Sequence, residues 1–193
     1  MKVNSSYKVK IIGVNRVLDG TITVYREALS YVIKVIDSEW VIIGNLATVK
    51  EQYNYIESLI HNTKHNMALY DFDDKFYKYP SYLRRSTAAD ALGIVSSYRS
   101  NLNNYNKEEQ VALDEGRKFT KKPPKLQLKH FKCPALYRGN MFELLPGNQA
   151  MIKVFNGCDW VWTLVNLRHQ DVKYINKQKG KISSPTLEKA GRG

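Results

Sequence analysis

The sequence AMIKVFNGCDWVWTLVNL, residues 150–167, predicts a β-hairpin. Its two arms, 150–155 and 159–167, are rich in the β-branched and aromatic residues that favour strands. Between the arms stands Asn156-Gly157, the dipeptide that most readily adopts the positive φ angles of a tight β-turn. The carboxy-terminal part of the chain is therefore predicted to contain an antiparallel sheet.

Other segments are predicted to join or flank this sheet. Residues 126–131 and 136–145 have the composition of strands, and residues 182–187 predict one more. Between the hairpin and residues 182–187, residues 168–178 predict a short basic helix. The opening strand, 7–14, has no partner among the helical segments that follow it, so its partners must come from the sheet after residue 124.

Three amphipathic helices are predicted between the opening strand and the sheet. Apolar residues recur at steps of three and four over 22–43, 49–60 and 88–105, which is the period of a helix with one buried stripe. Thr48 followed by Glu51 is the signature of a capping box at the start of the second helix. The three stripes can bury one another in a small bundle.

The fold class that follows is α+β: a β-barrel or curled antiparallel sheet with an inserted three-helix lobe. Residues 1–18 are predicted to form the first part of the barrel, residues 19–116 the helical lobe, and residues 117–193 the rest of the barrel. A barrel that ended at residue 193 would be truncated, with an unpaired strand at its edge.

The positive charge of the chain lies in its last 77 residues. Residues 1–116 contain 14 Lys and Arg and 14 Asp and Glu, whereas residues 117–193 contain 16 and 4, which gives the whole formal charge of +12. Clustered cations repel one another unless phosphates or lipid headgroups screen them, so this part is expected to face a polyanion. No apolar stretch approaches the length of a membrane span, and we expect a cytoplasmic protein without a membrane partner.

Two stretches resemble the amino-terminal half of TnpB proteins, which are transposon-encoded, RNA-guided nucleases. They are PSYLRRSTAADALGIVSSYRSNL at 80–102 and FNGCDWVWTLVNL at 155–167. The order of segments is similar as well, with an opening strand, a helical insertion and a basic β return. The resemblance implies a wedge-type barrel and a recognition lobe that hold a structured guide RNA and its heteroduplex with target DNA.

The resemblance also implies a RuvC-like nuclease domain and a zinc ribbon, and their motifs do not occur in this sequence. We therefore expect binding of guide RNA and RNA–DNA heteroduplex without cutting, with no catalytic residue, metal or cofactor. One alternative is a non-functional remnant of a truncated transposase gene. Another is one half of a split RNA-guided nuclease, whose cutting domain a separate nuclease chain supplies.

The predicted nucleic-acid contacts are basic side chains and one tyrosine. Six lysines fall within 15 residues and could follow a phosphate backbone. The resemblance places Arg84 and Arg85 at the heteroduplex channel; the alternative is a surface pair bonded to nearby aspartates. Trp160 and Trp162 share one face of a strand, and we expect them to belong to the barrel core and not to a base-stacking platform. The predicted contacts are Arg84, Arg85, Lys118, Lys121, Lys122, Lys125, Lys129, Lys132, Tyr137, Arg138, Lys173 and Lys177.

Overall fold

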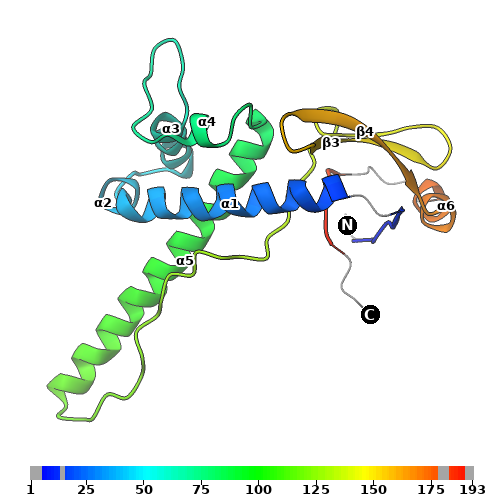
Figure 1. Ribbon diagram of the computed structural model, residues 1–193. Helices are drawn as coiled ribbons and strands as arrows, with labels where there is room; N and C mark the ends of the chain where they lie inside the picture. Colours follow the sequence, from blue (N-terminus) through cyan, green and yellow to red (C-terminus); the bar gives the residue numbers. More distant parts are fainter. Residues whose placement is uncertain (1–5, 14–15, 178–182, 190–193) are drawn as a thin grey trace. The chain divides into compact units, whose positions relative to one another are not determined.

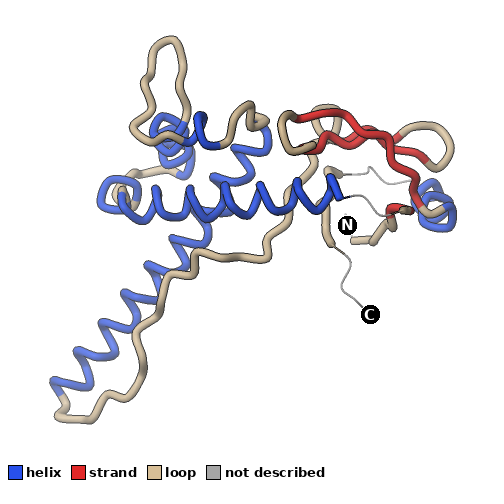
Figure 2. The backbone as a smooth tube through the Cα atoms, viewed as in Figure 1, coloured by secondary structure: helices blue, strands red, loops and turns tan. Residues whose placement is uncertain are grey.

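A computed structural model describes residues 6–13, 16–177 and 183–189 of the chain. Helices and strands occur in the order shown in Figure 1, with the helices and loops distinguished in Figure 2. They are β1 (Ile11–Ile12), α1 (Arg16–Ser38), α2 (Trp40–Ile43), α3 (Val49–Ile60), α4 (Phe72–Lys75), α5 (Ser81–Asp114), β2 (Phe142–Leu144), β3 (Gln149–Phe155), β4 (Trp160–Leu167) and α6 (His169–Lys177). This mixture of helices with an antiparallel sheet confirms the predicted α+β class.

The chain divides into two compact units. The first, the sheet unit, consists of the described residues of Met1–Val24, Lys78–Leu83 and Cys133–Gly193. The second, the helical unit, consists of Tyr25–Tyr77 and Arg84–Lys132. The division falls within α1 and α5, so each of these helices contributes residues to both units.

The sheet has four antiparallel strands in the order β1-β4-β3-β2. Ile11 of β1 pairs with Leu167 of β4, which confirms that the opening strand finds its partner in the carboxy-terminal sheet. β1 and β2 are the edge strands and do not pair with each other. Among the described residues the sheet is therefore open, and the closed barrel, one of the two predicted forms, is not made.

The β3–β4 hairpin is confirmed, and its loop has four residues. The side-chain oxygen of Asn156 accepts hydrogen bonds from the backbone N–H groups of Cys158 and Asp159, at 3.0 and 2.8 Å. Gly157 has a φ of +104°, a conformation that residues with a Cβ rarely adopt. Asn156-Gly157 therefore makes the turn through both the side chain of the asparagine and the backbone freedom of the glycine.

Several predicted strands are shorter or absent. Residues 126–131 form no strand, the segment 136–145 contains only β2, and β1 occupies two residues of the predicted 7–14. Thr186 makes a single bridge to Ala135 in place of a strand at 182–187. Residues 14, 178 and 182, at the ends of three predicted elements, lie outside the described residues.

A buried carboxylate ties the amino-terminal segment to α6 within the sheet unit. Asp171 accepts hydrogen bonds from the Tyr7 hydroxyl at 3.1 Å, the Lys10 backbone N–H at 2.9 Å and the Arg168 Nε at 3.0 Å. The hydrogen bond from Arg168 is the main cause that lowers the pKa of Asp171 to about 2, and the Lys10 N–H adds to it. Two segments far apart in the sequence are thus joined at one charged group.

The helical unit is built on the three predicted stripes. Apolar residues of α1, α3 and α5 are buried, among them Leu29, Ile56 and Val95. Thr48 and Glu51 form the predicted capping box, in which the Glu51 N–H donates to the Thr48 hydroxyl and the Glu51 carboxylate accepts from the Thr48 N–H, both at 3.2 Å. Among the described helices, none combines the length and the apolar composition needed to cross a membrane.

Candidate nucleic-acid interface

Residues 117–132 have neither helical nor strand structure and run back along α5 (Figures 1 and 2). We call this segment the basic strap. Near its start the ring of Phe119 lies 5.2 Å from that of Tyr105, and near its end the Lys132 ammonium lies 3.3 Å from Asp90. The strap is therefore antiparallel to α5, and both belong to the helical unit over this length.

Side chains of α1 hold the end of the strap through its carbonyl oxygens. Ser30 donates a hydrogen bond to the Leu128 carbonyl at 2.6 Å, and Arg26 donates to the carbonyls of Phe131 and Lys132 at 3.2 and 3.1 Å. These carbonyls would be paired with a neighbouring strand in a sheet. Here helix side chains take that place, which keeps the strap extended without making it a strand.

The strap alternates between two faces. From residue 124 to residue 130 the even-numbered side chains are partly covered and the odd-numbered ones are exposed. Leu126 and Leu128 are on the covered face, whereas Lys125 and Lys129 are on the exposed one. Since an extended chain rises about 3.3 Å per residue, the backbone positions of these two lysines are about 13 Å apart.

The strap contains seven Lys and Arg residues and no Asp or Glu, and all seven are exposed. Three have carboxylate partners: Arg117 with Glu115, Lys121 with Glu108 and Lys132 with Asp90. No other carboxylate in the described part of the chain pairs with a strap residue. We call the remaining four the unpaired strap lysines; they are Lys118, Lys122, Lys125 and Lys129.

The strap is basic against an acidic background. The helical unit as a whole contains 16 Lys and Arg and 13 Asp and Glu, a net charge of +3. Without the strap the same unit has 9 Lys and Arg against those 13 acids, a net charge of −4. The positive charge of this unit is therefore concentrated along the strap, as the binding of a polyanion to that segment requires.

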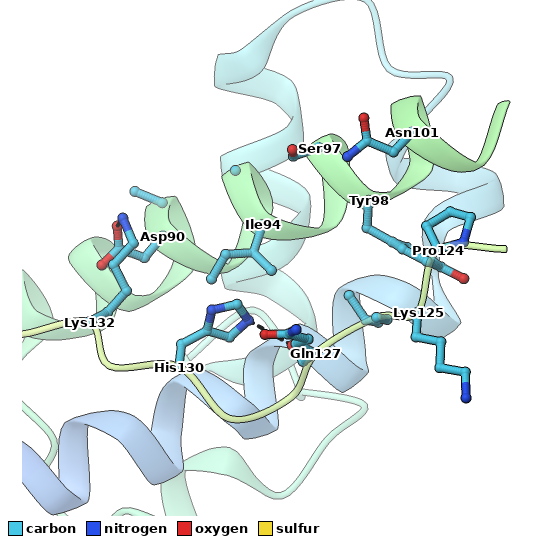
Figure 3. Close-up of a pocket in the computed structure, with 13 residues that line it drawn as sticks. Asp90, Ile94, Ser97, Tyr98, Asn101, Pro124, Lys125, Gln127, His130 and Lys132 are labelled. Atoms are coloured by element: carbon cyan, nitrogen blue, oxygen red, sulfur yellow. Dashed lines mark hydrogen bonds and ion pairs between the residues drawn. The ribbon is translucent and has the colours of Figure 1, made fainter. Parts of the chain in front are cut away.

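A pocket of about 500 Å³ opens between α5 and the strap (Figure 3). Figure 3 shows Ile94 and Tyr98 directed from α5 toward the strap and His130 directed from the strap toward α5. The His130 imidazole is fixed by a hydrogen bond from Nε2 to the Gln127 carbonyl at 2.7 Å. Asp90, at one end, also accepts a hydrogen bond from the Tyr25 hydroxyl at 2.6 Å.

A protein-family model, that of the Aq_aa04 family, matches residues 5–156. The chain belongs to the Aq_aa04 family. The match to the Aq_aa04 family covers the whole helical unit, with the strap and the pocket, and ends directly after β3. Neither the curated proteins nor the solved structures contain a match to this chain.

The two arginines predicted from the resemblance lie in different environments, both within the part that matches the Aq_aa04 family. The Arg84 side chain is only 8% exposed, and its Nε lies 3.2 Å from a carboxylate oxygen of Glu57 on α3. Its partner is therefore neither solvent nor the aspartates near residue 71. Arg85 is exposed. Sequence reasoning missed Glu57 because it lies 27 residues away on another helix.

The other predicted contacts belong to the sheet unit, so the structure does not group them with the strap. The Tyr137 ring is half-buried and lies 5.3 Å from that of Tyr82. Arg138 is exposed, and its backbone N–H donates to the Ser184 hydroxyl. Lys173 and Lys177 are exposed on α6, beyond the region that matches the Aq_aa04 family.

The two tryptophans share one face of β4, as predicted, and differ in exposure. Trp160 is buried against Tyr79 and Phe155, with ring centroids 5.5 Å away in both cases. Trp162 is 41% exposed and pairs across the hairpin with Lys153. The core prediction therefore describes Trp160 but not Trp162.

By sequence, the ranges of the sheet unit contain 14 Lys and Arg and 5 Asp and Glu, a net charge of +9.

Proposed function

We propose that the chain binds nucleic acid along the basic strap, as the guide-RNA and heteroduplex-binding portion of a TnpB-like transposon protein that does not itself cut. The observation that carries the proposal is the set of unpaired strap lysines, exposed on a segment whose carboxy-terminal part helix side chains already hold. Each phosphate that such a lysine neutralises releases counterions, which drives binding.

The anchoring of the strap supports a binding role over that of a merely soluble linker. A flexible basic linker would lose conformational freedom when it bound a strand, and that loss weakens binding. In this chain the carbonyls near residues 128–132 are already bonded to α1, so part of the ordering happens on folding. The resemblance to TnpB proteins favours RNA as the strand that is bound.

The proposal assigns no reaction to the chain. Among the described residues, no three His, Cys, Asp or Glu side chains lie close enough to hold a metal ion. The open sheet favours one extension of the proposal, because an unpaired edge strand can pair with a second chain. In that case a separate nuclease chain would complete the protein, and it would copurify when the two are expressed together.

Salt-dependent binding tests the proposal. The purified chain is titrated with a labelled single-stranded RNA, an RNA–DNA heteroduplex and a DNA duplex at rising sodium chloride, with anisotropy as the readout. Four phosphate contacts predict that log K for single-stranded RNA falls against log salt with a slope of about −3. Absence of binding to all three, or a slope near zero, would refute the proposal. A melting curve without a cooperative transition would favour the alternative, a non-functional remnant of a truncated transposase gene.

A further inference from the structure

The pocket between α5 and the strap has the volume of a small-molecule site. Its volume of about 500 Å³ falls within the range of pockets that hold drug-sized or cofactor-sized ligands. Its walls come from one face of α5 and from strap residues of both faces. They are lined by Ala89, Asp90, Gly93, Ile94, Ser97, Tyr98, Asn101, Pro124, Lys125, Leu126, Gln127, His130 and Lys132.

The lining offers two kinds of contact to one ligand. Ile94, Tyr98 and Leu126 are apolar or aromatic and can cover the face of a flat ring. Ser97, Asn101 and Gln127 carry side-chain donors and acceptors that make no hydrogen bond within the described chain. A flat ring with polar groups at its edge satisfies both kinds of contact, and nucleobases have that chemistry.

Charges divide the pocket into two ends. At one end the Asp90 carboxylate accepts from Lys132 and Tyr25 and keeps unused lone pairs, which suit a base N–H donor and repel a phosphate. Toward the other end stands Lys125, an unpaired strap lysine, with Lys129 on the same exposed face of the strap. A nucleotide would fit with its base edge toward Asp90 and its phosphate toward Lys125.

Gly93 leaves room for such a ligand in the middle of α5. A glycine inside a helix costs about 1 kcal/mol relative to alanine. Packing does not require it here, because a Cβ added at Gly93 would meet no atom within 4 Å. The missing side chain enlarges the pocket that this residue lines.

We propose that this pocket receives one unstacked nucleobase of the strand that the strap binds, with the neighbouring phosphates on the unpaired strap lysines. The inference rests on the proposed function, since it concerns the same strand. It adds base contact to an interface that otherwise reads only charge. Base-stacking contacts of this kind strengthen binding by about 10- to 100-fold per base.

Two substitutions of one glycine test the pocket with a matched control. Gly93→Phe fills the pocket, whereas Gly93→Ala leaves it open, and both residues favour a helix more than glycine does. The probes are oligoadenylate RNA and inorganic polyphosphate of equal charge, which has no bases. We expect Gly93→Phe to weaken oligoadenylate binding about 10- to 100-fold. Polyphosphate affinity should be unchanged, and Gly93→Ala should bind both probes as the parent chain does.

Equal oligoadenylate affinity of the two variants would overturn the base pocket and leave the proposed function intact. An equal loss of affinity for oligoadenylate and polyphosphate in Gly93→Phe would overturn it too, since the effect would not depend on bases. Failure of the parent chain to bind either probe would refute the proposed function itself. Melting curves check folding, and Ser97→Phe, one turn along α5, is the second filling variant if Gly93→Phe does not fold.

Discussion

Replacing the four unpaired strap lysines by glutamine should reduce the salt dependence of RNA binding. The substitution removes four positive charges from exposed side chains that make no ion pair in the described structure, so it breaks no ion pair there. Ser30 and Arg26, which anchor the strap, donate their hydrogen bonds to its backbone carbonyls, so the substitution leaves these anchors in place. The stability of the chain should therefore change little.

The size of the effect follows from the number of lysines. On a single strand each neutralised phosphate contributes about −0.7 to the slope of log K against log salt, so four contribute about −2.8. Over a fourfold rise in salt, from 50 to 200 mM, that part of the slope corresponds to a loss of about 50-fold in affinity. The variant should lack this part of the salt dependence and should bind most weakly, relative to the parent chain, at low salt.

The assay is an anisotropy titration of labelled RNA at each salt concentration, with a control variant of equal charge. Four other lysines of the helical unit are also exposed and make no ion pair in the described structure, and they lie outside the strap. They are Lys34, Lys50, Lys64 and Lys107. If replacing these four by glutamine lowers the slope as much as replacing the strap lysines, the reasoning is refuted, because net charge and not the strap would then decide binding.

Three further predictions concern the scaffold. Thr48→Ala should lower the free energy of unfolding by about 1 kcal/mol through loss of the α3 cap, and Thr48→Ser should restore it, as measured in urea. Arg84→Met should destabilise the chain by about 2–3 kcal/mol, because it leaves the partly buried Glu57 without its partner, yet the folded variant should bind RNA with the parent affinity; weaker binding would contradict a buried role. Asp171 has a folded pKa of about 2, below that of an unfolded aspartate, so its stabilisation is present above about pH 4 and is lost as the pH falls toward 2. The Asp171→Asn variant should have a lower free energy of unfolding at neutral pH than the parent chain, and that free energy should depend less on pH over the acid range. An acid transition equal to that of the parent chain would contradict this role of Asp171.

The helices and the hairpin could be predicted because their signals are local. The capping box needs only Thr48 and Glu51, and the hairpin needs only two strand-like arms and Asn156-Gly157. The pairing of β1 with β4 required one further argument, that an opening strand without a helical partner must pair with the later sheet. Each of these inferences uses residues whose partners are close in sequence or constrained by topology.

The strap could not be predicted, because its pattern fits two structures equally well. Alternating covered and exposed residues from 124 to 130 indicate an extended chain, and the sequence does not say whether a sheet or a helix surface lies beside it. The deciding contacts come from Ser30 and Arg26, about 100 residues earlier. The pocket depends on the same placement, so it was equally invisible in the sequence.

Arg84 shows the same limit for the candidate site. Its motif suggested a surface role, and Arg85 beside it is indeed exposed. One position along a helix rotates a side chain by about 100°, which is enough to move the guanidinium from solvent into a contact with α3. Without the position of α3, neighbouring arginines could not be told apart.

Lysine footprinting tests the central claim most directly. The folded chain is acetylated with and without bound RNA, and the modified lysines are quantified by mass spectrometry. The account predicts that RNA protects Lys118, Lys122, Lys125 and Lys129 from acetylation and leaves Lys34, Lys50, Lys64 and Lys107 as reactive as in the free chain. RNA binding that left the first group reactive, or protected both groups alike, would contradict it.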